Sequence, residues 1–190
     1  MAAINQKIIV GYIQGVPMSK QEIIERCEKL VKRSEFVYNL TICPNNRRYD
    51  DLECWHIEED VKSFINMSLK SKTTDYHYDV VGAYEKFPNN PTRAHVHCQL
   101  YIYAVYLERG YSDKQKSTMI GNCMDKLSGL LNKKVGNTKI AKNMPYVKRA
   151  AIRYRHGLSP LEDTEYTEYP EYYHYMLKQL KYESDFFVIN

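Results

Sequence analysis

The spacing of apolar residues along the chain predicts alternating helices and strands. Apolar positions that recur every three or four residues are typical of helices, and they occur over residues 19–33, 51–69, 112–131 and 170–182. Runs rich in β-branched and aromatic residues are typical of strands, and they occur over residues 35–43, 76–87, 93–105 and 146–154. Ser19 with Glu22, and Ser112 with Gln115, have the spacing of capping boxes at helix starts.

The order of these segments predicts an α+β fold, with a central antiparallel β-sheet flanked by helices. Residues 76–87 and 93–105 are joined by a connection too short for a parallel crossover, so they are expected to form a hairpin. A chain of 190 residues fits one domain over 1–190, with residues 1–34 as a candidate N-terminal extension.

Composition narrows the class of protein. No apolar run approaches the roughly 18 residues that span a membrane, and the N-terminus lacks the pattern of a signal peptide. The five cysteines are odd in number and form no CxxC pair, which argues against a disulfide framework or a structural zinc site. We therefore expect an intracellular protein without a membrane partner.

The net charge of +4 is unevenly distributed along the chain. Residues 133–156 hold eight basic residues and no Asp or Glu: Lys133, Lys134, Lys139, Lys142, Lys148, Arg149, Arg153 and Arg155. Such a block is either a solvated surface loop or a surface for an anionic partner. The interleaved Tyr146 and Tyr154 favour nucleic acid, because tyrosine rings stack on exposed bases.

The predicted strand 93–105 carries the most informative pattern. Alternate side chains of a strand share a face, so Val96, Cys98, Leu100 and Ile102 would form an apolar face. The opposite face would then present His95 and His97 together, at a spacing that allows both imidazoles to bind one metal ion. The alternative is a half-exposed strand whose histidines alternate by chance.

A carboxylate on the neighbouring strand favours the metal site. The hairpin would bring Glu85 beside His95 and His97, although Asp79, His77 and His56 are alternatives as the third ligand. Two imidazoles and one carboxylate leave coordination positions open for water and phosphate oxygens. That ligand set suits Mg²⁺ or Mn²⁺ acting as a Lewis acid.

The last predicted helix offers a nucleophile. Tyr175 and Lys178 are three residues apart and share a helix face. A phenol, which ordinarily titrates at about pH 10, becomes a better nucleophile beside an ammonium group. With 18 tyrosines in the chain, such a pair also arises by chance, and Tyr172 and Tyr173 are competing candidates.

Three blocks of the sequence, spanning roughly residues 36–181, resemble the HUH endonucleases, specifically the replication initiators of small single-stranded DNA viruses and rolling-circle plasmids. They are the strand motif at residues 36–44, the histidine-hydrophobic-histidine motif at 95–97 preceded by Glu85, and the Tyr-x-x-Lys motif of Tyr175 and Lys178. The resemblance implies that Glu85, His95 and His97 hold the metal, that Tyr175 forms a covalent 5′-phosphotyrosine link to DNA, and that Lys178 assists.

The resemblance also implies partners and a cellular location. The substrate would be single-stranded DNA at a replication origin, where nicking and joining would start rolling-circle replication. No GxxxxGK[ST] pattern occurs, so we expect no helicase domain and a host or partner helicase instead. A viral protein of eukaryotes would act in the host nucleus, and a plasmid or phage protein in the cytoplasm.

Two alternatives share these residues. A transposase or a mobilisation relaxase of the HUH type would use the same chemistry on a different DNA substrate. A single-stranded nucleic-acid-binding module without catalysis would use the histidines and tyrosines as a stacking surface. Binding by such a module would be sensitive to salt and independent of metal.

Overall fold

Helices and strands alternate along the part of the chain that the structure describes. The structure is a computed structural model, and it describes residues 9–13, 16–45, 55–69, 74–87, 90–107, 110–144, 171–178, 180 and 186–189. Its strands are β1 (Ile9–Ile13), β2 (Val16–Ser19), β3 (Phe36–Pro44), β4 (Thr74–Phe87), β5 (Asn90–Leu107), β6 (Gly136–Lys142) and β7 (Phe186–Ile189). Its helices are α1 (Lys20–Arg33), α2 (Trp55–Leu69), α3 (Asp113–Lys134) and α6 (Tyr172–Met176).

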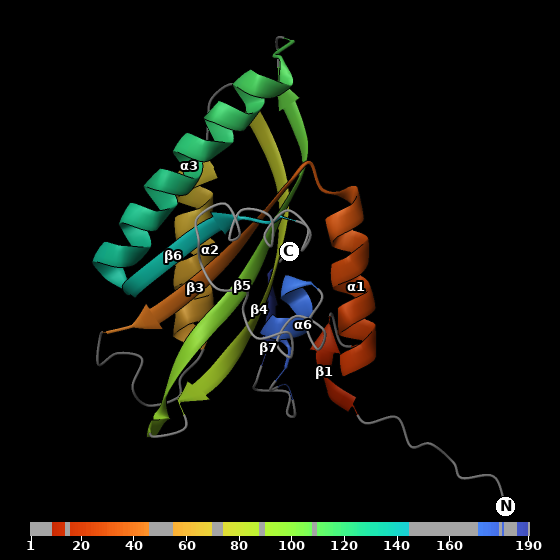
Figure 1. Cartoon of the computed structure of the whole chain (residues 1–190), viewed down its shortest axis with the longest axis vertical. Coiled ribbons are helices and arrows are strands. Elements are labelled where there is room, and N and C mark those ends of the chain that lie inside the picture. The colour runs from red at the N-terminus through yellow and green to blue at the C-terminus, as the bar shows by residue number, and fades with distance from the viewer. Residues whose placement is uncertain are drawn as a thin grey trace, which may run out of the picture.

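A five-stranded antiparallel sheet in the order β6-β3-β5-β4-β7 lies at the centre (Figure 1). The long strands β4 and β5 form the predicted hairpin, and β1 and β2 pair separately in a two-stranded sheet. The predicted α+β class, with an antiparallel sheet and flanking helices, is therefore confirmed.

Both predicted capping boxes are present. The Ser19 hydroxyl accepts from the backbone N–H of Glu22, whose carboxylate accepts from the N–H of Ser19. Ser112 and Gln115 make the same reciprocal pair at the start of α3. Each box pairs backbone donors that the first helical turn leaves without intrahelical partners.

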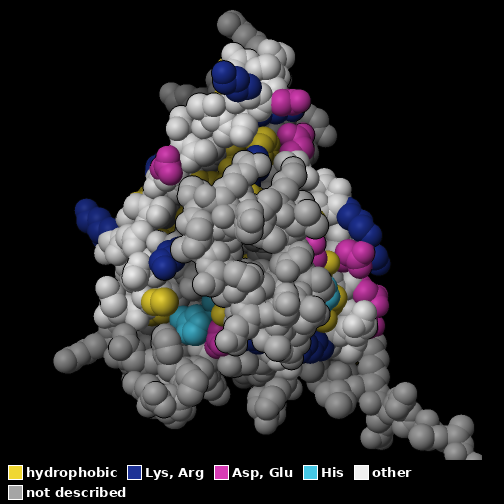
Figure 2. Space-filling view, viewed as in Figure 1, with side chains coloured by type: hydrophobic (Ala, Val, Ile, Leu, Met, Phe, Trp, Pro, Cys, Tyr) yellow, Lys and Arg dark blue, Asp and Glu magenta, His cyan; other side chains and the backbone are white. Residues whose placement is uncertain are grey.

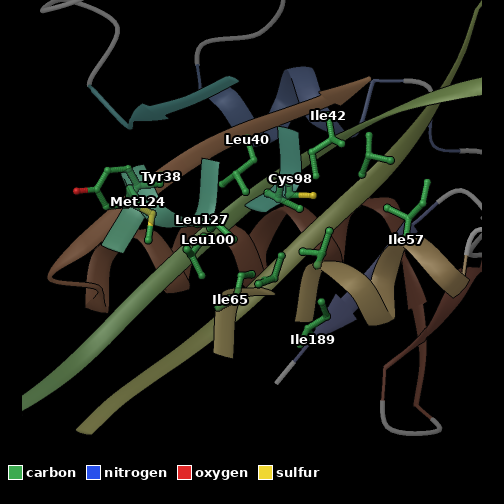
Figure 3. Packing of buried hydrophobic residues seen from close by; sticks show 14 of the residues in the cluster. Tyr38, Leu40, Ile42, Ile57, Ile65, Cys98, Leu100, Met124, Leu127 and Ile189 are labelled. Atoms are coloured by element: carbon green, nitrogen blue, oxygen red, sulfur yellow. The ribbon is translucent and has the colours of Figure 1, made fainter. Parts of the chain in front are cut away.

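One face of the sheet packs against α2 and α3. As predicted, Val96, Cys98, Leu100 and Ile102 of β5 point into this layer and are fully buried. Leu40 and Ile42 from β3, Ile57 and Ile65 from α2, and Met124 and Leu127 from α3 pack around them (Figure 3). Most of the apolar core lies in this layer, and it makes the sheet a rigid support for its other face.

The opposite face packs against α1 and α6, which lies in front of the sheet in Figure 1. Ile23, Cys27 and Leu30 of α1 pack against Tyr101 of β5 in this second cluster, the α1 cluster. The α1 helix falls within the segment 1–34, the candidate N-terminal extension, and its apolar side belongs to the core. Tyr173, Met176, Leu177 and Leu180, at the spacing of three and four residues typical of a helix face, are buried there too.

Several elements differ from the prediction. The last helix was predicted over 170–182, but α6 ends at Met176 and a turn follows at residues 177–178. The strands β1, β2, β6 and β7 were not predicted. The strand predicted over 146–154 lies outside the described residues.

Two remaining expectations concern membranes and cysteines. None of the helices in the described ranges is both long and apolar enough to cross a membrane. Cys27, Cys43, Cys98 and Cys123 are free thiols, and Cys27 and Cys98 are buried core residues.

Candidate functional site

The register of the central hairpin brings the predicted metal ligands together. Glu85 on β4 lies directly opposite His95 on β5, and His97 lies opposite Ala83. Residues paired across a ladder point to the same face, as do alternate residues of one strand. Glu85, His95 and His97 therefore share the sheet face that α1 and α6 cover.

The three side chains converge on one point. The Nε2 atoms of His95 and His97 each lie 2.8 Å from Oε2 of Glu85. All three ligand atoms lie within 4.8 Å of one another, so this group could bind a metal ion. Two imidazole nitrogens and one carboxylate oxygen form a ligand set that suits a divalent cation.

The surroundings favour the protonation states that bind a cation. Burial opposes ionisation of Glu85, but hydrogen bonds from Lys178 and His97 outweigh it and lower the pKa of the carboxyl. Burial lowers the pKa of His97 to about 4, despite its hydrogen bond with Glu85. At neutral pH the site therefore holds a carboxylate and a neutral His97 imidazole, as metal coordination requires.

Lys178 and Tyr175 lie beside this group, where the sequence motif predicted them. Lys178 Nζ lies 2.8 Å from Oε1 of Glu85 and 3.8 Å from the centre of the Tyr175 ring. The Tyr175 ring centre is 5.1 Å from that of His97. The helix α6 ends before Lys178, but the backbone N–H of Lys178 donates to the carbonyl of Tyr175 at 3.1 Å. This hydrogen-bonded turn keeps the side chains of Tyr175 and Lys178 together.

The ion pair with Glu85 keeps Lys178 charged. Burial alone would lower the pKa of Lys178, but its interactions with Glu85 and Tyr175 raise the pKa above its ordinary value. The ammonium group therefore remains a fixed positive charge beside the Tyr175 ring at neutral pH.

The three candidate tyrosines occupy different environments. Burial raises the pKa of Tyr172, although a hydrogen bond with Thr41 opposes the rise, and its hydroxyl donates to the carbonyl of Leu40 at 3.0 Å. Tyr173 is 6% exposed and packs in the α1 cluster. Tyr175 is the one that lies beside both His97 and Lys178.

The alternative metal ligands are not part of the group. Asp79 accepts hydrogen bonds of 2.8 Å from both Arg33 and the Tyr103 hydroxyl. Neither Asp79 nor His77 joins the cluster of ligand atoms found among the described residues. The side chain of His56 lies outside the described residues.

The four predicted DNA-binding residues that the structure describes are spread over the surface. Lys139 is exposed on β6, opposite Thr41, which in turn lies opposite His97, so Lys139 shares the face of the metal group. Lys142 is opposite Tyr38 and belongs to the other face, and Lys133 and Lys134 lie in the last turn of α3. Lys148, Arg149, Arg153 and Arg155 lie outside the described residues.

Figure 2 shows the same distribution of charge. On the face that it presents, the coloured Lys and Arg side chains are scattered around the margin, and histidine side chains reach the surface near acidic ones. Among the described residues in this view, the basic side chains form no single continuous patch.

Two polar residues that contact His97 were not recognised from the sequence. Thr41 Oγ1 and the Tyr172 hydroxyl each lie 3.3 Å from Nδ1 of His97. Tyr172 was considered only as a nucleophile, although its place three residues before Tyr175 puts both on one side of α6.

The sequence matches no protein-family model and no curated protein, and the structure matches no solved structure. Any functional conclusion therefore rests on the geometry of the site and on the motifs in the sequence.

Proposed function

We propose that this protein is a metal-dependent endonuclease of the HUH type that nicks and rejoins single-stranded DNA to start rolling-circle replication. The observation that carries the proposal is the convergence of Glu85, His95 and His97 beside Tyr175 and Lys178. These residues come from β4, β5, α6 and the turn that follows α6. Transfer of a phosphodiester to tyrosine uses a metal site, a phenol as nucleophile and a positive charge beside it, and this group of residues offers all three.

In the proposed reaction the Tyr175 oxygen attacks the phosphorus of the DNA backbone. The bond from Tyr175 to phosphorus forms while the bond from phosphorus to the 3′ oxygen breaks. The phenol loses its proton and the 3′ oxygen gains one, which leaves a free 3′-hydroxyl and a 5′-phosphotyrosine. Attack by a 3′-hydroxyl on this link reverses the step, so a strand can be rejoined without another source of energy.

The side chains around Tyr175 would stabilise charge and hold the metal ion. A bound divalent cation would polarise the phosphate oxygens. Lys178 would stabilise the negative charge that develops around Tyr175 and the phosphate. Glu85 binds Lys178 through one carboxylate oxygen and both histidines through the other, so it links the two halves of the site.

We further propose Mg²⁺ or Mn²⁺ as the metal, because carboxylate, water and phosphate oxygens are ligands that both ions prefer. Lys139 would hold the DNA backbone on the site face. The substrate would be single-stranded DNA at a replication origin, opened by a host or partner helicase. The protein would act in the host nucleus or in the cytoplasm, according to its source.

The test is the formation of a covalent protein–DNA adduct. The full chain is incubated with a labelled pool of single-stranded DNA sequences, with Mn²⁺ or with chelator, and the products are separated on a denaturing gel. We expect an adduct that requires Mn²⁺, and mass spectrometry should locate it on Tyr175.

Matched variants sharpen this test. Tyr175→Phe removes only the hydroxyl, so it should abolish the adduct while metal binding persists. Tyr173→Phe makes the same chemical change in the buried α1 cluster and should leave the adduct unchanged. His95→Ala should remove the metal-dependent reaction. DNA binding that is indifferent to chelator, without any adduct, would instead support a binding module without catalysis.

A further inference from the structure

The two ring nitrogens of His97, Nε2 and Nδ1, have different neighbours, and these indicate which nitrogen would bind a metal ion. Nε2 faces Glu85 at 2.8 Å, whereas Nδ1 faces two hydroxyl groups, those of Thr41 and Tyr172, each at 3.3 Å. A neutral imidazole carries one proton, on either Nδ1 or Nε2. Without a metal ion that proton lies on Nε2, which donates it to the Glu85 carboxylate. A cation bound at Nε2 would take the place of this proton, and the imidazole would then carry its proton on Nδ1.

The hydroxyl of Tyr172 has one proton, and the structure shows where it points. It donates to the carbonyl oxygen of Leu40 at 3.0 Å. With that proton engaged, the Tyr172 oxygen can face His97 only as an acceptor. The contact between Tyr172 and His97 is then satisfied when Nδ1 carries the imidazole proton and donates it.

We infer that Tyr172 is a positioning residue that accepts the Nδ1 proton of His97 when a divalent cation takes the place of the Nε2 proton, and so stabilises the tautomer in which Nε2 binds the cation. The inference rests on the metal centre of the proposed function. Metal-binding histidines usually donate their second ring N–H to an oxygen acceptor, which fixes both the tautomer and the ring orientation. Here a tyrosine, itself bound to the backbone of β3, provides that acceptor.

The position of Tyr172 in the chain gives this role a second consequence. Tyr172 and Tyr175 lie three residues apart in α6, and their ring centres are 6.2 Å apart. The helix that carries the proposed nucleophile therefore also carries the residue that orients a metal ligand. A displacement of α6 would disturb the metal site and the nucleophile together.

The test measures metal affinity in the full chain, with Mn²⁺ as the probe. Mn²⁺ binding is followed by electron paramagnetic resonance in wild type, Tyr172→Phe and Tyr173→Phe. We expect Tyr172→Phe to weaken binding about 10- to 100-fold, the usual effect of removing such a partner. Tyr173→Phe, a neighbouring buried tyrosine in the α1 cluster, should bind Mn²⁺ as wild type does.

A spectroscopic measurement on the wild-type protein keeps the inference testable if Tyr172→Phe fails to fold. With Mg²⁺ bound, ¹⁵N chemical shifts of the His97 ring should show a protonated Nδ1 and a coordinated Nε2. A coordinated Nδ1, or unchanged Mn²⁺ affinity in a folded Tyr172→Phe protein, would overturn the inference and leave the metal centre intact. Absence of Mn²⁺ binding in wild type would overturn the metal centre of the proposed function and the role of Tyr172 with it.

Discussion

Mild acid should destabilise the metal-free protein through His97. The folded protein lowers the pKa of His97 from its ordinary value of 6.5 to about 4, because the imidazole is buried. The unfolded chain therefore takes up this proton first, and the free energy of unfolding falls as the pH drops from 6.5 towards 4. The difference in proton uptake between the folded and unfolded protein lowers the free energy of unfolding by about 2 kcal/mol between pH 7.5 and pH 5.

A measurement near pH 5 distinguishes the stability contribution of His97 from that of Glu85. The folded protein lowers the pKa of Glu85 below 4.5, its ordinary value. Its stabilising contribution is therefore present above pH 4.5 and is lost only as the pH falls through the folded pKa. At pH 5 the loss due to His97 is already large, whereas that of Glu85 has hardly begun.

The assay is urea unfolding followed by circular dichroism at pH 7.5 and pH 5, with chelator present throughout. His97→Gln keeps a polar side chain but removes the titrating group. The loss of stability between the two pH values should therefore be about 2 kcal/mol smaller in this variant than in wild type. His77→Gln is the matched control, because His77 is exposed on β4, and it should show the wild-type loss.

An equal loss in wild type and His97→Gln would refute the reasoning. It would mean that the His97 imidazole takes up a proton as readily in the folded protein as in the unfolded chain. Protons would then compete with a metal ion for Nε2 at a higher pH than the burial of this ring implies.

Three further changes test other parts of the structure. Lys178→Met removes the ammonium that lies 2.8 Å from Glu85 Oε1, and adduct formation in the gel assay should slow about 100-fold or more, with the protein still folded. Gly82→Ala would place a Cβ 2.2 Å from the Phe187 ring, so this buried ring must shift, and urea unfolding should show a loss of about 1–3 kcal/mol. Ser112→Ala removes the cap of α3 and should cost about 1 kcal/mol in the same measurement.

The sequence predicted the centre of the sheet well, because its signals there are local and strong. The alternation in β5 separates buried apolar residues from the histidine face, and one short turn fixes β4 as its neighbour. The edge strands gave no such signal. The edge strand β6 carries two exposed lysines, Lys139 and Lys142, which suit an unpaired edge but do not alternate with apolar residues. The other edge strand, β7, has four residues and is too short to show a period.

In the site, too, the residues on the central strands were predictable from local sequence patterns, whereas the tyrosine was not. The geometry of Glu85, His95 and His97 follows from strand parity and hairpin register, which a sequence can reveal. The choice among Tyr172, Tyr173 and Tyr175 depends on how α6 is rotated against the sheet, and three tyrosines within one helical turn do not specify that rotation. Packing against α1 decides it, because burying Tyr173 directs Tyr172 and Tyr175 to the histidines.

The short α6 segment thus connects the fold to the proposed chemistry. The buried residues and the site residues of this helix and of the residues after it form two interleaved sets: Tyr173, Met176, Leu177 and Leu180 in the core, and Tyr172, Tyr175 and Lys178 at the ligand group. A helix of five residues has little stability of its own. Its position must come from the core contacts and from the hydrogen bond of Tyr172 to β3. Apolar packing on one side of this segment therefore sets the distances between the proposed nucleophile, the Lys178 ammonium and the Glu85, His95 and His97 group on the other.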